Sequence, residues 1–178
     1  MEPASPVLPE PPDWSRERKR LLEWAPSKSL LASIRSYQRH VARRSPWSLL
    51  MRHWAVLRHR FWSAVTAADV PLNCHIEGGL LMPHPASIVI HPDARIGPNC
   101  LIFQGVTLGT SHSSTVPTLE GHVDVGAGAK VLGGVRLGWY SKIGANAVVL
   151  TDVPAYATAV GVPAQVIVRR EAKASRTA

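Results

Sequence analysis

The sequence predicts a mainly β fold, a left-handed parallel β-helix of hexapeptide repeats with an N-terminal α-helical segment. Across residues 70–149 an aliphatic residue returns at every sixth position, apart from two interruptions. This period fits neither an amphipathic helix nor a single half-buried strand, and a β-sandwich would show turns about every 8–12 residues. Three hexads would close one coil, with these residues stacked inside it. The stacked residues are Val70, Ile76, Met82 and Ile88, then Ile90, Ile96, Ile102 and Leu108, and then Leu119, Val125, Val131, Leu137, Ile143 and Val149.

A second small or apolar residue follows most of these positions four residues later, where the chain would turn a corner of the coil. The two cysteines, Cys74 and Cys100, both belong to this set, so we interpret them as core residues rather than a redox pair or a metal site. Glycine at the second position of a hexad, as at Gly97 and Gly109, fits a corner that needs close backbone approach. The fifth-position residues are Cys74, Ala86, Ala94, Cys100, Val106, Val123, Ala129, Val135, Ala147 and Val153.

Four segments are predicted along the 178 residues. Residues 1–26 form a disordered or irregular tail, and residues 1–13 in particular are proline-rich and without periodicity. Residues 27–69 form a helical segment, residues 70–170 the β-helix with a closing strand near its end, and residues 171–178 a polar tail. Helices are expected over about 27–43 and 46–68, and we expect them to cap the first coil. One apolar face of the second helix contains Leu49, Leu50, Trp54, Leu57, Phe61, Trp62 and Val65.

The net charge of +8 is concentrated before the β-helix. A solvated helix face is the favoured explanation, and association with an anionic membrane surface is the less favoured one. No nucleic-acid-binding motif accompanies the charge, so we expect no nucleic acid partner. No stretch is long and apolar enough to span a membrane, and residues 1–12 lack the apolar region of a signal peptide, so we expect a cytoplasmic protein. Of the 20 Lys and Arg residues, residues 70–168 contain only Arg95, Lys130, Arg136 and Lys142.

The two interruptions of the six-residue register are where chemistry is expected, since irregular segments on a rigid scaffold can carry function without disturbing the core. The first is a two-residue offset that follows Met82-Pro83-His84-Pro85. The second is the polar stretch 110–118, which we expect to project as a loop. His84 occupies the third position of its hexad and should point away from the core.

Over roughly residues 43–170 the chain resembles the serine acetyltransferases and their hexapeptide-repeat relatives. The glycine-rich hexads alone specify only the fold. A histidine followed by an offset, and then a Gln-x-Val-Thr-Leu-Gly segment, is the more specific signature. The resemblance is carried by Gly79-Leu80-Leu81-Met82-Pro83-His84, Phe103-Gln104-Gly105-Val106-Thr107-Leu108-Gly109, Val125-Gly126-Ala127-Gly128-Ala129-Lys130-Val131-Leu132-Gly133 and Gly161-Val162-Pro163-Ala164.

The resemblance implies that His84 is the general base and that Asp69, fifteen residues earlier, orients it. A neutral imidazole can remove a proton from a hydroxyl that attacks a thioester, and a carboxylate on its other nitrogen stabilises the imidazolium. The resemblance also implies acetyl-CoA as the acyl donor, bound in a groove between neighbouring solenoids of a homotrimer, with no metal. Its binding residues would be Gly109, Ala127, Ala145, Arg169 and Arg170.

The charged groups that hold an amino acid in serine acetyltransferases are replaced here by Ser45, Pro83, Thr115 and Val116. The predicted function is therefore an acetyl-CoA-dependent O-acetyltransferase acting on L-serine or on another small or sugar hydroxyl. His91, His112 and His122 are candidates for acceptor binding. A zinc site formed by His84, His112 and His122, as in the carbonic anhydrases that share this fold, is disfavoured by the histidine spacing. The alternative function is a non-catalytic scaffold that binds a partner through its basic helices.

Overall fold

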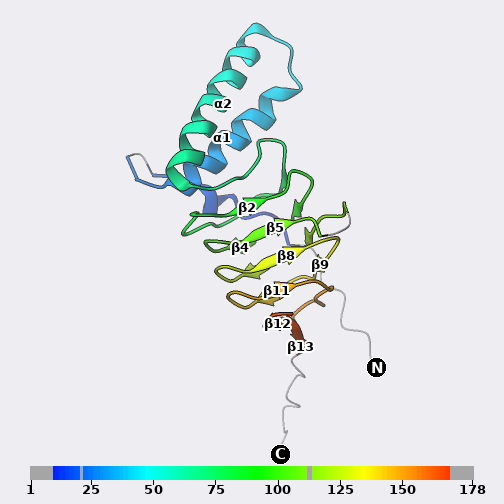
Figure 1. The fold of residues 1–178 in the computed structure, drawn as a ribbon. Coiled ribbons are helices and arrows are strands. Elements are labelled where there is room, and N and C mark those ends of the chain that lie inside the picture. The colour runs from blue at the N-terminus through cyan, green and yellow to red at the C-terminus, as the bar shows by residue number, and fades with distance from the viewer. Residues whose placement is uncertain (1–9, 21, 112–113, 169–178) are drawn as a thin grey trace, which may run out of the picture.

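Three parallel β-sheets form the faces of a prism in the computed structural model, which describes residues 10–20, 22–111 and 114–168 (Figure 1). From β3 to β11 each strand lies on the face after that of the preceding strand, the coil order expected for the predicted left-handed parallel β-helix. The first face contains β1 (His75–Ile76), β3 (Arg95–Ile96), β6 (Thr118–Leu119) and β9 (Arg136–Leu137). The second contains β4 (Leu101–Ile102), β7 (Asp124–Val125), β10 (Lys142–Ile143), β12 (Thr158–Val160) and β13 (Gln165–Ile167). The third contains β2 (Val89–Ile90), β5 (Thr107–Gly109), β8 (Lys130–Leu132) and β11 (Val148–Val149).

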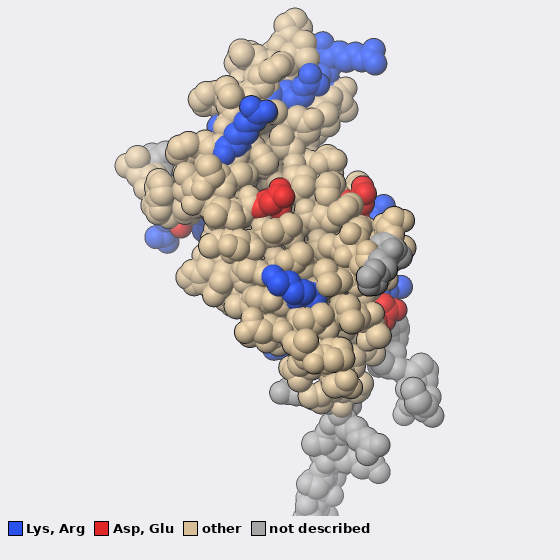
Figure 2. All heavy atoms as spheres, in the orientation of Figure 1, with Lys and Arg blue, Asp and Glu red and all other residues tan. Residues whose placement is uncertain are grey.

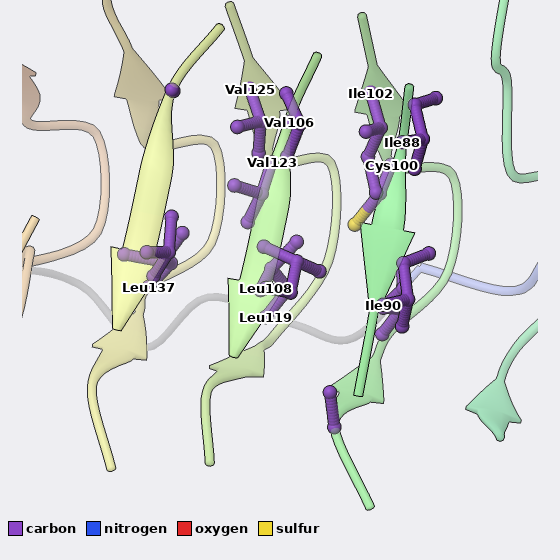
Figure 3. Close-up of a cluster of buried hydrophobic side chains, with 14 of the residues drawn as sticks. Ile88, Ile90, Cys100, Ile102, Val106, Leu108, Leu119, Val123, Val125 and Leu137 are labelled. Carbon is purple, nitrogen blue, oxygen red and sulfur yellow. The ribbon is translucent and has the colours of Figure 1, made fainter. Parts of the chain in front are cut away.

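The core consists of the predicted aliphatic columns, and every residue of the six-residue register is buried. Strand pairing stacks equivalent positions of successive coils, so that Val125 pairs with Ile102 of the preceding coil and with Ile143 of the following one. Figure 3 shows the side chains of Ile102 and Val125 stacked along the prism in this way. The register predicted from the sequence is therefore confirmed.

The fifth-position residues are also buried, with one exception. Cys74 and Cys100 lie in the core as predicted, and burial raises the pKa of the Cys74 thiol to about 11 and that of the Cys100 thiol to about 12. The prediction for Ala86 is wrong, because its side chain is exposed. The two-residue offset shifts the corner, and Ile88 fills the inward place instead.

Helix α1 (Pro26–Val41) covers the open end of the first coil, as expected. Its residues Leu30, Leu31 and Ile34 are buried in the same apolar cluster as the solenoid columns. Arg35 donates hydrogen bonds to the carbonyl oxygens of Ile76 and Glu77, which belong to that coil's edge. The helix thus satisfies strand groups that would otherwise lack partners.

Helix α2 (Pro46–Thr66) is present, but its predicted packing face is wrong. The residues it buries are small or polar, namely Ser48, Ala55 and Thr66. Small side chains let α1 and α2 approach closely as an antiparallel hairpin. The large apolar residues expected to pack inward, Leu49, Leu50, Trp54, Leu57, Phe61 and Val65, are exposed, and only Trp62 is partly buried against the core.

The N-terminal segment from Glu10 to the 3₁₀-helix η1 (Trp14–Glu17) lies along one corner of the solenoid. The backbone N–H of Asp13 donates to Asn99 Oδ1 at 2.7 Å, and Asn99 Nδ2 donates to the Pro11 carbonyl at 3.1 Å. Glu10 Oε2 lies 3.0 Å from His122 Nε2. Residues 10–13 therefore have no regular secondary structure but are held against the solenoid by these contacts, and residues 1–9 lie outside the described part of the chain.

The C-terminal end of the solenoid closes with β13, the expected closing strand. It pairs antiparallel with β12, whereas the other strand pairs are parallel. Arg169 and Arg170 lie outside the described residues.

Candidate active site

The turn that carries His84 stacks on equivalent turns of the later coils, at the corner between the second and third faces. Gly105 N–H donates to the Ala86 carbonyl at 2.9 Å, which joins this turn to the next coil. Gly128 N–H then donates to the Gln104 carbonyl, and Asn146 N–H to that of Ala127, each at 2.8 Å. We refer to residues 83–87, 103–105, 126–128 and 144–146 as the catalytic corner.

One backbone conformation recurs along the catalytic corner. The φ angle is +58° at Ser87, +70° at Gly105, +74° at Gly128 and +57° at Asn146. These left-handed turns are the reason that glycine and asparagine recur here, since both tolerate positive φ better than most residues. Because the turns superpose coil by coil, His84, Ala127 and Ala145 lie along one edge of the prism.

Asp69 lies beside the turn that carries His84. Its backbone N–H donates to the Ile88 carbonyl at 2.8 Å, and Ser87 N–H donates to the carbonyl of the nearby Ala67 at 2.9 Å. The side chains of both His84 and Asp69 are exposed. Among the residues that the structure describes, no hydrogen bond or ion pair joins these two side chains, so the dyad stays a prediction.

Gly109 is not brought together with Ala127 and Ala145 within one chain. It ends β5 at the opposite edge of the third face, where its carbonyl accepts a hydrogen bond from Gly133 N–H at 2.9 Å. The loop that follows it lines a cavity of about 410 Å³, to which Ser111, Thr115, Leu132, Gly133, Gly134, Val135, Leu150, Thr151 and Asp152 contribute.

A larger cavity of about 640 Å³ lies between η1 and α1, lined by Trp14, Glu17, Arg18, Ala32, Arg35, Gln38 and Arg39. Neither cavity is lined by His84.

The other candidate histidines do not gather around His84 within one chain. The backbone of His91 donates to the Leu108 carbonyl beside Gly109, and its Nδ1 accepts the N–H of Asp93 at 3.2 Å. His122 lies at the corner that holds the N-terminal segment. His112 falls outside the described residues, and within the described part no group of three His, Cys, Asp or Glu side chains could hold a metal ion.

Ser45, which stands where the resemblance places an acceptor-binding aspartate, caps helix α2. Its hydroxyl accepts a hydrogen bond from Ser48 N–H at 3.2 Å, a common use of serine at a helix start. This contact gives Ser45 a structural role.

Lys130 is a polar residue of this region that the sequence analysis did not assign to the site. Its Nζ donates to the Gly105 carbonyl at 2.6 Å and to Thr107 Oγ1 at 3.1 Å, so the ammonium group lies beside the catalytic corner. The pairing of Lys130 with Thr107 places it there. These contacts could be found only once it was known which coil lies next to β8 (Lys130–Leu132).

Comparison with known proteins gives the same family as the sequence motifs. A serine acetyltransferase of Synechococcus elongatus is 43% identical over 108 residues, which are 59% of this chain and 44% of that protein. One of Mycobacterium tuberculosis is 38% identical over 133 residues, 68% of this chain and 58% of that protein. The structure of soybean serine acetyltransferase complexed with serine is 30% identical, with a TM-score of 0.60, over 78% of this chain and 70% of that one. The chain belongs to the serine acetyltransferase family.

A serine acetyltransferase structure in complex with CoA also matches, at 34% identity and a TM-score of 0.67, over 81% of this chain and 58% of that one. No family model matches the chain. The chain spans about half the length of the curated serine acetyltransferases named above.

Proposed function

We propose that this chain transfers an acetyl group from acetyl-CoA to the hydroxyl of a small acceptor, with L-serine as the first candidate. The observation that carries the proposal is the alignment of His84 with Ala127 and Ala145 along the catalytic corner, beside the segment that contains Asp69. Family membership supports the acyl donor, because one family structure is a complex with CoA, and it supports L-serine as the first acceptor, because another is a complex with serine.

In the proposed reaction, the imidazole of His84 accepts the proton of the acceptor hydroxyl as the oxygen attacks the thioester carbonyl carbon. The C–S bond then breaks, and the departing CoA thiolate takes up a proton from the imidazolium. Asp69 would hold the ring and stabilise its charged form. The products are the acetyl ester and free CoA thiol, so atoms and charge balance.

The donor would lie along the catalytic corner, where small side chains at Ala127 and Ala145 leave the backbone accessible to an extended ligand. Gly109 and the loop after it lie at the far edge of the third face. A second copy of the chain could bring that edge to the catalytic corner of the first. We therefore propose a homotrimer with its sites between chains, and light scattering that showed a monomer at micromolar concentration would contradict it.

The test is the release of CoA thiol from acetyl-CoA, with L-serine, homoserine and a panel of sugars as acceptors. His84→Ala should reduce turnover by about 10²–10⁴, the usual contribution of a positioned general base. Asp69→Asn should reduce it less, and the double variant should lose little more than His84→Ala. His75→Ala is the matched control, because His75 is an exposed histidine on β1, on another face. Near-parental turnover in His84→Ala would defeat the mechanism.

A non-catalytic scaffold is the competing proposal, and the structural role of Ser45 is consistent with it. A scaffold predicts no acceptor-dependent thiol release with any member of the panel. Arg169 and Arg170 remain proposed contacts for the donor's phosphates. The cytoplasmic location likewise remains a prediction from the sequence.

A further inference from the structure

Helix α2 presents its large apolar side chains to solvent. Six of them recur at intervals of three or four residues and are between 41% and 65% exposed. This spacing places them on one side of a helix. We call this set the outer stripe: Trp47, Leu50, Trp54, Leu57, Phe61 and Val65.

Apart from an edge-to-face contact of Phe61 with Trp62 of the same helix, no other described element covers the outer stripe, because α2 packs on α1 through a separate, small-residue face. A continuous apolar ridge of this kind on a soluble domain marks an interaction surface, whereas isolated exposed apolar residues do not. Figure 1 shows the hairpin projecting beyond one end of the solenoid, which leaves α2 accessible.

The charges of the hairpin restrict what can cover the stripe. Residues 26–66 contain no Asp or Glu, and Figure 2 shows Lys and Arg side chains on the hairpin. On a helical projection, Arg58 borders one side of the outer stripe and Arg60 the other. Only two of the hairpin's cations form ion pairs within the described residues, Lys28 with Glu23 and Arg35 with Glu17. The cations of the hairpin are Lys28, Arg35, Arg39, Arg43, Arg44, Arg52, Arg58 and Arg60.

We propose that the outer stripe lies on an anionic membrane surface. A helix with tryptophan and leucine on one side and arginines along its borders suits the boundary between lipid headgroups and acyl chains. No described helix is long and apolar enough to cross a membrane, so the contact would be with the surface. Two copies of the hairpin placed stripe to stripe would bring arginines together with no acidic residue between them, which disfavours self-association here.

The experiment is co-sedimentation of the full chain with vesicles. One set contains phosphatidylcholine alone, and the other an equal mixture of phosphatidylcholine and phosphatidylglycerol. The parent should bind the mixed vesicles and not the neutral ones, and added salt should weaken the binding. Arg58→Gln and Arg60→Gln combined should reduce the affinity by more than about one order of magnitude.

The outer stripe is tested by the double variant Trp54→Glu, Phe61→Glu, which should lose binding. Its matched control is Ile167→Glu, because Ile167 is 53% exposed and lies at the other end of the solenoid. Circular dichroism of both variants confirms that the helices persist. Absence of binding to the mixed vesicles, equal binding to both vesicle types, or equal binding by the two variants would overturn the proposal. The proposal would also be overturned if the parent bound no vesicles and light scattering gave a lower mass for the double variant than for the parent, since the outer stripe would then face a second copy of the chain.

Discussion

Val131→Ala tests the stacked core directly. Val131 is 0% exposed and pairs with Leu108 of the preceding coil and Val149 of the following one. Removing two buried methyl groups costs about 1.6 kcal/mol of transfer free energy. The cavity they leave, roughly 50 Å³, adds about 1.2 kcal/mol if the rigid coils do not collapse into it. The free energy of unfolding should therefore fall by about 3 kcal/mol.

Urea unfolding followed by circular dichroism measures this change, at one fixed protein concentration because an oligomer unfolds in a concentration-dependent way. For a domain of this size the midpoint should fall by about 1 M. The control is Val166→Ala, whose side chain in β13 is 36% exposed and should cost no more than about 0.5 kcal/mol. A Val131→Ala midpoint equal to that of the parent would refute the six-residue register, and Val131→Asp should abolish the fold.

Three further outcomes follow from the structure. Gly97→Ala should prevent normal folding, because a Cβ at that position would lie 1.2 Å from the backbone carbonyl oxygen of Glu120. In Gly109→Ala the nearest atom to the new Cβ would be 3.6 Å away, an ordinary contact, so this variant should melt close to the parent. Thermal melts of the two variants compare them. Cys100 should not react with a thiol reagent at pH 8 until denaturant is added, and reaction in the folded protein would contradict its burial. Burial raises the pKa of this thiol from 9.0 to about 12, so between these pH values the unfolded chain loses the thiol proton while the folded chain keeps it. The contribution of Cys100 to the free energy of unfolding should therefore be fully present below pH 9.0 and decline as the pH rises to about 12.

The sequence predicted the columns of the β-helix well because a six-residue period constrains each buried position directly. It failed at Ala86, where a two-residue offset moved the corner to Ile88. The prediction for α2 failed for a different reason. Periodicity shows that Leu50, Trp54 and their neighbours share one side of a helix, but it does not show whether that side faces the core.

For the candidate site, too, some features could be predicted from the sequence and others required the structure. His84 and Asp69 came from the motif resemblance, and only the strand register placed their segments side by side. The contact of Glu10 with His122 joins residues far apart in the sequence, and no local pattern could have indicated it. The position of Lys130 beside Gly105 likewise depends on which coil lies next to which.

Residues 110–117 stand between β5 and β6 in place of a hexad, and the described strands on either side keep their pairing. Thr107 still pairs with Lys130, and Thr118 with Arg136, as in coils that have no insertion. The exposed residues Thr110, Ser111, Ser114 and Thr115 can therefore vary without altering the core columns, whereas Pro117 is buried and its carbonyl accepts a hydrogen bond from Arg95 N–H at 3.1 Å. Exchange of these exposed residues between members of the family should therefore leave the solenoid intact, so this part of the chain can be replaced without a new design of the scaffold.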